Sequence, residues 1–313
     1  MTTHRLLGLI AQQLLKSVSK LRKRKVVDFA AFSAGKRHAE ALQANVISAK
    51  RLAELHPLHA RYVAVQHQVS VMSEQLIVLP ELARLSKALT DAEDMYLPSG
   101  PPMSPLTSSH FFFWSTFDAA VGTRKETLGT CLIALLKRLR SDPEFVRLVE
   151  IMQGSRMGLY LHLRVEGKCV WLRDLVTGVD ASCLVPAGYL GRPDEVWLAR
   201  VFPPPSAEFR DSIVITTPYV IVRPRAPGWY AFLERTLPKL KCSTPYEAYD
   251  RLMKYGLSLN YWNEYILEAY ASAETSAIFL RGLPDIDLSR PHSRQTEALL
   301  NSAHGVESRD EGD

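Results

Sequence analysis

The sequence predicts an α+β fold: a mainly helical chain with a small central antiparallel sheet or partial barrel over about residues 168–223. On both sides of that segment, apolar residues recur every three or four positions, which is typical of amphipathic helices. Inside it, short β-rich runs are separated by turn residues. The chain has 313 residues, of which 47% are hydrophobic and 23% charged. This composition is that of a globular protein able to bury a core.

The positive charge of the chain is concentrated in its first part. Residues 1–67 contain 12 Lys and Arg against 3 Asp and Glu, a net charge of +9, whereas the remainder contains 26 against 30. A charge that is local in this way indicates either a solvated helix or a surface for an anionic partner.

Residues 5–25 form the first predicted helix, because Leu7, Ile10 and Leu14 recur at spacings of three and four. The helix ends in a basic run, and cations at that end favour the helix dipole, so a solvated helix end is the simplest explanation. The alternatives are contacts with nucleic-acid phosphates or with an anionic membrane surface. The residues that would make such contacts are Lys20, Arg22, Lys23, Arg24, Lys25, Lys36 and Arg37.

Two more helices are predicted in the first hundred residues. Residues 33–55 form a helical pattern, and Pro57 either ends that helix or lies just past its end, because proline cannot continue a helix interior. Residues 62–79 show some strand-like alternation of valines, but the flanking helices favour helix there as well. The apolar face of the first helix is expected to pack either on residues 33–55 or on a second copy of the chain, so self-association is an open alternative.

A stretch rich in Pro, Ser and Gly at residues 91–109 is the best candidate boundary. The predicted organisation is a basic helical region (1–97), a linker or loop (98–109), an α+β domain (110–288) and a polar, disordered tail (289–313).

Helices are also predicted immediately before the sheet. The aromatic run at residues 111–114 cannot lie on one face of a helix, so we expect it in the core. Residues 126–140 form an amphipathic pattern. Asp142 is a good N-cap and Pro143 a good first helical residue for a helix that continues towards Leu161.

The central segment contains four predicted short strands. A Thr-Gly turn at residues 177–178 joins the first two β-rich runs as a hairpin. Residues 195–202 lack clean alternation, which indicates a strand buried on both faces. Pro218 interrupts the last run, residues 212–222, and makes it an edge strand or a bend.

Part of this segment resembles a known type of module. The string VWLRDLVTG at residues 170–178, followed by VWLARV at 196–201, is similar to a small β module in uncharacterised bacterial proteins. Some of those proteins carry a Cys-rich zinc-binding tail of the SEC-C type, and this sequence has no such tail. The resemblance covers residues 168–202 and implies a fold element, with no activity attached to it.

Behind the sheet, residues 229–237 are predicted to be helical, and Thr244-Pro245 begins another helix. Aromatic residues follow at helical spacing, which predicts a helical hairpin covering the sheet. An aromatic pocket is the alternative. The short apolar run at residues 277–280 is either a helix end or a buried strand.

The spacing of the cysteines indicates whether the protein is found in a reducing or an oxidising compartment. Cys131, Cys169, Cys183 and Cys242 are widely spaced without a Cys-x-x-Cys pair, which argues against a structural zinc site and against a disulfide-stapled fold. No apolar run is long enough to predict a membrane span. The N-terminal apolar stretch is interrupted by glutamines and followed by positive charge, unlike a signal peptide. We therefore expect a cytoplasmic protein.

The sequence shows no recognised catalytic signature: it lacks a nucleophile elbow, a zinc-protease helix and a dinucleotide fingerprint. His56, His59 and His67 are divided by a proline and have no acidic or thiol ligand beside them, so they are not expected to bind a metal. Asp285 and Asp287 border the predicted tail, where turn chemistry explains them. No metal site and no cofactor is predicted.

The sequence favours a non-catalytic binding or scaffold protein whose partner it does not reveal. One alternative is a nucleic-acid-associated protein that uses the basic N-terminal helix. The other is a hydrolase-like enzyme of unrecognised type. Loops on a rigid scaffold carry function more often than strands do, so the candidate residues on the sheet are Arg173, Asp174 and Arg192.

Overall fold

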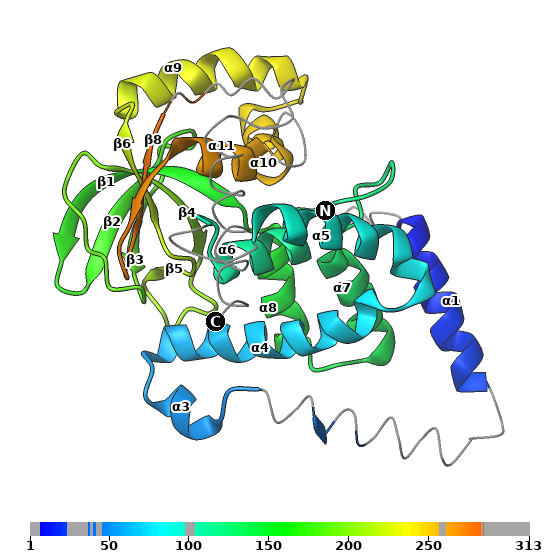
Figure 1. Cartoon of the computed structure of the whole chain (residues 1–313). Coiled ribbons are helices and arrows are strands. Elements are labelled where there is room, and N and C mark those ends of the chain that lie inside the picture. Colours follow the sequence, from blue (N-terminus) through cyan, green and yellow to red (C-terminus); the bar gives the residue numbers. More distant parts are fainter. Residues whose placement is uncertain are drawn as a thin grey trace, which may run out of the picture. The chain divides into compact units, whose positions relative to one another are not determined.

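The structure is a computed structural model, which describes residues 7–23, 37, 40–41, 46–97, 104–256, 261–282 and 284 (Figure 1). It confirms the predicted α+β fold. The chain forms two compact units, Met1–Ala88 with Ser115–Gly154 and Leu89–Trp114 with Ser155–Asp313. We call them the helical unit and the barrel unit. Among the helices described, none has the length and apolar character needed to cross a membrane.

The elements of the helical unit are α1 (Leu9–Lys23), α3 (Ala49–Ala53), α4 (Pro57–Ile77), η1 (Pro80–Leu82), the first turns of α5 (Ala83–Tyr96), most of the π-helical turn η2 (Trp114–Asp118), α7 (Leu128–Leu139) and α8 (Pro143–Gly154). α4 contacts both α7 and α8, while α1 contacts α7 and η1. The unit is therefore held together by the apolar faces of helices that the sequence pattern largely predicts.

Pro57 lies past the end of α3, which is one of the two positions predicted for it, and it is the first residue of α4. Proline suits a first helical turn because its missing N–H has no partner to lose there. His56 acts as the N-cap, with Nδ1 accepting the N–H of Leu58 at 3.3 Å. α4 also confirms helix over most of residues 62–79. Most of the helix predicted over residues 33–55 lies outside the described residues.

A buried carboxylate holds the N-terminus of α1. Glu126 accepts the backbone N–H of Ile10 at 3.1 Å and that of Ala11 at 2.9 Å. The first N–H groups of a helix have no partner within the helix, and they lie at the positive end of its dipole. A carboxylate there stabilises the helix both by accepting these hydrogen bonds and by its favourable interaction with the dipole. A Cβ atom on Gly8 would lie 1.9 Å from Cδ of Glu126, so only glycine allows this approach.

Replacing this carboxylate is expected to release α1. Glu126→Ala should lower the free energy of unfolding by about 1–2 kcal/mol, because two helix N–H groups lose a charged acceptor. Amide exchange should accelerate in α1 first, and hydrogen-exchange mass spectrometry measures this. Gly8→Ala should have the same effect. Gly154→Ala is the matched control, since a Cβ there has nothing within 4 Å. Unchanged exchange in α1 of both variants would contradict the capping role.

Five strands of the barrel unit close into a small mixed barrel. They are β1 (Met157–Glu166), β2 (Cys169–Asp174), β3 (Asp180–Leu184), β4 (Val196–Phe202) and β5 (Ser212–Val214). β1 pairs antiparallel with both β2 and β4, and β5 pairs with β3 and β4, so the order β1-β2-β3-β5-β4 returns to β1. β6 (Tyr219–Arg223), β8 (Ile278–Arg281) and β7 (Tyr270–Ala273) extend the sheet outward from β4.

The sheet begins earlier than predicted and is mixed, not purely antiparallel. The helix expected to continue towards Leu161 ends at Gly154, and residues 157–166 form β1. β1 gains hydrogen-bonded partners on both of its edges, and this tertiary pairing outweighs its local helical pattern. The pairings β3–β5 and β6–β8 are parallel. The sheet also extends beyond residue 223, because β7 and β8 are added next to β6.

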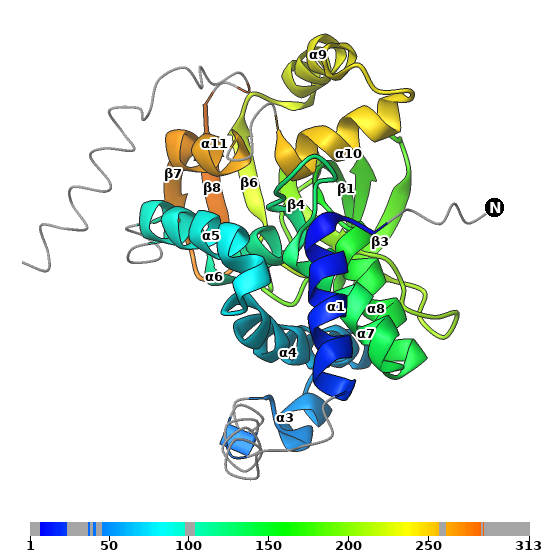
Figure 2. The same ribbon diagram turned by 90° about the vertical axis from the view of Figure 1, so that its right-hand side faces the viewer.

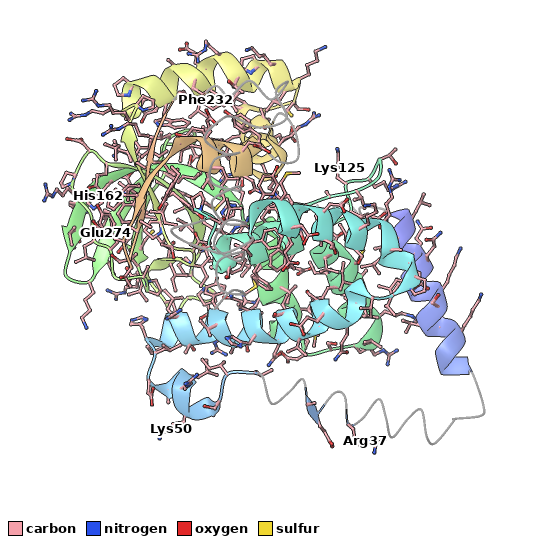
Figure 3. The ribbon with its side chains drawn as sticks, viewed as in Figure 1. Arg37, Lys50, Lys125, His162, Phe232 and Glu274 are labelled. Atoms are coloured by element: carbon pink, nitrogen blue, oxygen red, sulfur yellow. The ribbon has the colours of Figure 1, made fainter. Side chains whose placement is uncertain are left out.

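Side chains fill the interior of the barrel. Val170 and Leu172 on β2 are completely buried, whereas the residues that alternate with them face outward. Trp197 is the largest interior side chain, and its Nε1–H donates to Glu195 at 2.9 Å. His162 of β1, labelled in Figure 3, packs edge-on against Trp197. The interior is thus packed side chain and not a ligand channel.

The two cysteines of the barrel are free thiols on opposite faces of the sheet. Cys183 is paired across the strands with Val170 and is buried, whereas Cys169 is paired with Leu184 and is partly exposed. Burial raises the pKa of the Cys183 thiol, as expected for a small buried hydrophobe.

The remaining helices of the barrel unit are α6 (Ser108–Phe113), α9 (Ala226–Thr236), α10 (Pro245–Tyr255) and α11 (Tyr261–Ala269). α10 contacts β1 and α11 contacts β8 (Figure 2). Their packing is aromatic: Phe232, labelled beneath α9 in Figure 3, stacks on Tyr261, and Trp229 stacks on Trp262. These rings are buried, so they form core and not an aromatic pocket.

A buried histidine lies where α6 meets α11. His110 is 2% exposed, and its Nε2 lies 3.1 Å from Oδ1 of Asn263, an acceptor, so that nitrogen carries the proton. Burial lowers the pKa of His110 to about 4, and the charge of Arg200 acts in the same direction, while the hydrogen bond to Asn263 opposes them. His110 is therefore neutral in the folded protein at neutral pH.

This histidine predicts a loss of stability in mild acid. The unfolded chain takes up a proton near the ordinary pKa of 6.5, whereas the folded chain takes it up only near pH 4. Between these values protonation favours unfolding, and the loss reaches roughly 3 kcal/mol at pH 4. Urea unfolding across this pH range measures it. His110→Gln should show a shallower decline than the unaltered protein, and an identical decline would contradict the assignment.

Candidate anion-binding site

The exposed sheet residues predicted from the sequence do not form one site. Arg173 faces outward from β2 and makes a bidentate ion pair with Asp180, at 2.6 Å and 2.9 Å. Asp174, the next residue, is buried and lies on the opposite face of the strand. Arg192 is exposed on the loop before β4.

Asp174 has a structural role in joining the β2–β3 turn to the start of β1. Its Oδ1 accepts the N–H groups of Val176 and Thr177, each at 2.9 Å. Its Oδ2 lies 3.4 Å from Nη2 of Arg156, whose guanidinium also packs 4.2 Å from the centre of the Tyr249 ring. Both side chains of the pair are only 10% exposed. Through Arg156, the β2–β3 turn is thus linked to Tyr249 of α10.

Removal of Asp174 should destabilise the barrel unit far more than removal of its exposed neighbour. Asp174→Ala removes the nearer carboxylate of the buried Arg156, whose other partner Asp250 lies at 3.9 Å, and it removes the acceptor of two backbone N–H groups. Together these losses are expected to cost about 3 kcal/mol of unfolding free energy. Asp180→Ala removes only a solvent-screened partner of Arg173 and should have a much smaller effect. Urea unfolding of the two variants tests this. Similar losses in both would contradict the distinction.

The basic residues predicted at the N-terminus are only partly described. Lys20 is exposed on α1. Arg22 and Lys23 belong to the same helix, but the structure does not describe their side chains, and Arg24, Lys25 and Lys36 lie outside the described residues. Arg37 is exposed. Contact between this helix and nucleic acid therefore stays a prediction.

Three arginines that the sequence analysis did not select meet in the barrel unit. β6 ends at Arg223, a cis peptide bond to Pro224 follows, and Arg225 is the N-cap of α9. β8 ends at Arg281, which the parallel pairing of β6 and β8 sets directly opposite Arg223. Together with adjacent residues they line an open hollow of about 800 Å³, which we call the arginine hollow.

The guanidinium groups of the arginine hollow have no carboxylate partner among the residues that the structure describes. All three side chains are exposed, and none of them forms an ion pair within the described ranges. By contrast, Arg164 on β1, Arg173 on β2 and Arg156 just before β1 each have a carboxylate partner. Like charges opposite one another on neighbouring strands repel, so a bound anion would relieve an unfavourable interaction.

The N-terminus of α9 adds to the positive potential of the arginine hollow. A helix start carries partial positive charge and unpaired N–H groups, which favour anions. In α9 the contribution is mainly that of the dipole, because Pro227 has no N–H and the N–H of Gly228 donates to the carbonyl of Arg225 at 2.9 Å. The first turn packs closely on the cis-proline loop, because a Cβ on Gly228 would lie only 2.7 Å from Cβ of Pro224. The helix start is thus held beside the three side chains.

The chemistry of the arginine hollow is recognition of anions. Guanidinium groups stay protonated throughout the physiological pH range and present paired N–H donors that match phosphate and carboxylate oxygens. The other lining residues are Val222, Pro224 and Gly282, which offer no acid, base or nucleophile. No cluster of three potential metal ligands occurs in the described part of the chain, and Asp285 and Asp287 lie outside it.

Sequence reasoning missed the arginine hollow because its parts are distant in the chain. The Arg-Pro-Arg triplet at residues 223–225 was visible, but Arg281 joins it only through the β6–β8 pairing. A parallel pairing between strands so far apart in sequence leaves no local signal.

Comparison with known proteins gives no assignment: no family model, no curated protein and no solved structure matches this chain. The resemblance of residues 168–202 to a bacterial β module therefore stays a prediction.

Proposed function

We propose that this chain is a non-catalytic binding protein that holds a phosphate-bearing ligand in the arginine hollow. The observation that carries the proposal is the convergence of three arginines at the ends of β6 and β8 and the start of α9, with no carboxylate partner among the described residues. Arginine pairs with phosphate oxygens through two parallel hydrogen bonds, so two or three guanidinium groups can surround one phosphate or span adjacent ones.

The surroundings of the arginine hollow support a binding role over a catalytic one. Acid–base or nucleophilic catalysis needs titratable groups within hydrogen-bond reach of the reacting atoms. Arginine cannot supply them, since it does not titrate near neutral pH. The rigid framework is favourable for recognition, because β6, β8 and the start of α9 fix the backbone of all three arginines before any ligand arrives.

Binding of tripolyphosphate tests this function. Isothermal titration calorimetry should show saturable binding that weakens as salt is added. Arg281→Ala should weaken the affinity about tenfold, because one charge-assisted contact is worth about 1.5 kcal/mol. Arg223→Ala combined with Arg281→Ala should weaken it roughly a hundredfold.

Arg84→Ala is the matched control for the loss of one charge. Arg84 is exposed on the first turns of α5, in the helical unit, and has no ion-pair partner in the described residues. This variant should bind tripolyphosphate as the unaltered chain does. Equal affinity in the double variant and in the Arg84 control would refute the proposed function.

A further inference from the structure

We propose that the ligand of the arginine hollow is single-stranded nucleic acid, whose chain continues from the three arginines past α9 onto the outer face of β2. This inference rests on the proposed function and specifies its ligand. It is motivated by exposed aromatic side chains that alternate with basic ones along this surface.

Trp171 provides the first aromatic surface. It lies on the outward face of β2, between the buried Val170 and Leu172, and is partly exposed. The guanidinium of Arg164 lies 4.2 Å from the centre of its ring, and the indole N–H donates to Glu166 at 2.8 Å. The ring is therefore held in one orientation, on the outside of a barrel whose interior cannot admit a ligand.

Tyr230 provides the second aromatic surface and connects β2 with α9. It is 43% exposed on the second turn of α9, five residues after the N-cap Arg225. Hydrogen bonding to Asp180 raises the pKa of Arg173, and the nearby phenol of Tyr230 acts in the same direction. The strand register connects the same regions: Arg173 is paired with Leu161 of β1, and the row continues through Val196 of β4 to Ile221 of β6, two residues before Arg223. Arg173 itself follows Trp171 by two residues on the same face of β2.

The distribution of charge sets where each part of the ligand would bind. Arg164 and Arg173 are each neutralised by a carboxylate at 2.6 Å, so the β2 face itself has little net charge. The uncompensated charge lies in the arginine hollow, with Lys168 exposed at the β1–β2 turn. Phosphates are thus expected at the hollow, and bases are expected to stack on Trp171 and Tyr230.

A single strand fits this surface better than the alternatives. Exposed aromatic rings stack on unpaired bases, which a duplex does not offer. A small anion such as inorganic phosphate would use the arginines but leave the rings without a role. An acidic peptide would satisfy the charges, yet its carboxylates carry no planar group to stack on the rings.

The test measures the binding of fluorescently labelled single-stranded oligothymidylate by anisotropy, with the full chain. Trp171→Leu and Tyr230→Leu should each weaken binding about tenfold, because stacking on one aromatic ring is worth 1–3 kcal/mol per base. Trp171→Phe and Tyr230→Phe should bind the oligonucleotide almost as tightly as the unaltered chain does, because phenylalanine keeps an aromatic ring at each position. Tyr246→Leu, which removes another exposed tyrosine of the barrel unit, should have no effect.

Salt and tripolyphosphate separate this inference from the proposed function. The slope of log affinity against log salt should fall by about 1.4 in the Arg223→Ala and Arg281→Ala double variant, corresponding to two lost phosphate contacts. The Trp171→Leu and Tyr230→Leu variants should leave both the slope and tripolyphosphate affinity unchanged.

Two results would overturn the ligand assignment while leaving the proposed function intact. In the first, the chain binds tripolyphosphate, but the Trp171→Leu and Tyr230→Leu variants bind the oligonucleotide as tightly as the unaltered chain does. The other is a duplex that binds as tightly as the single strand. If the chain binds neither tripolyphosphate nor the oligonucleotide, both proposals are refuted.

Discussion

Closure of the barrel depends on β1, which pairs along one edge with β2 and along the other with β4. A register irregularity between His162 and Arg164 allows the strand to bend between its two partners. Because β4 is fixed to β1 on one side, its other side is available to β6, and β6 in turn to β8. The positions of Arg223 on β6 and Arg281 on β8 therefore follow from a series of pairings that begins at β1 and passes through β4.

The arginines of the barrel unit differ in the contacts that their side chains make. Arg156 is buried against Asp174 and Tyr249 and joins a turn, a strand and α10. The arginines of the hollow make no comparable contact with any residue that the structure describes. Groups that stabilise the fold have carboxylates or rings beside them, whereas groups available to a ligand do not.

Much of the fold follows from local sequence chemistry. The caps at Asp142 and Thr244, with prolines after them, mark helix starts that the structure confirms. Local patterns failed where pairing at a distance decided the outcome. Residues 157–161 have a helical pattern and become a strand because two other strands pair with them. The arginine hollow was missed for the same reason, because Arg225 and Arg281 are too far apart in the sequence for any local pattern to include both.

The barrel also limits how this sheet can associate with other sheets. Once β1 to β5 are closed, the described strands leave β7 as the terminal edge beyond β8. β7 has only four residues, Tyr270–Ala273, and its register with β8 is interrupted between Tyr270 and Ser272. Short, irregular edges are poor templates for an additional strand. The unit is therefore built to resist edge-to-edge aggregation, so partners are expected to dock through side chains and not through backbone hydrogen bonds.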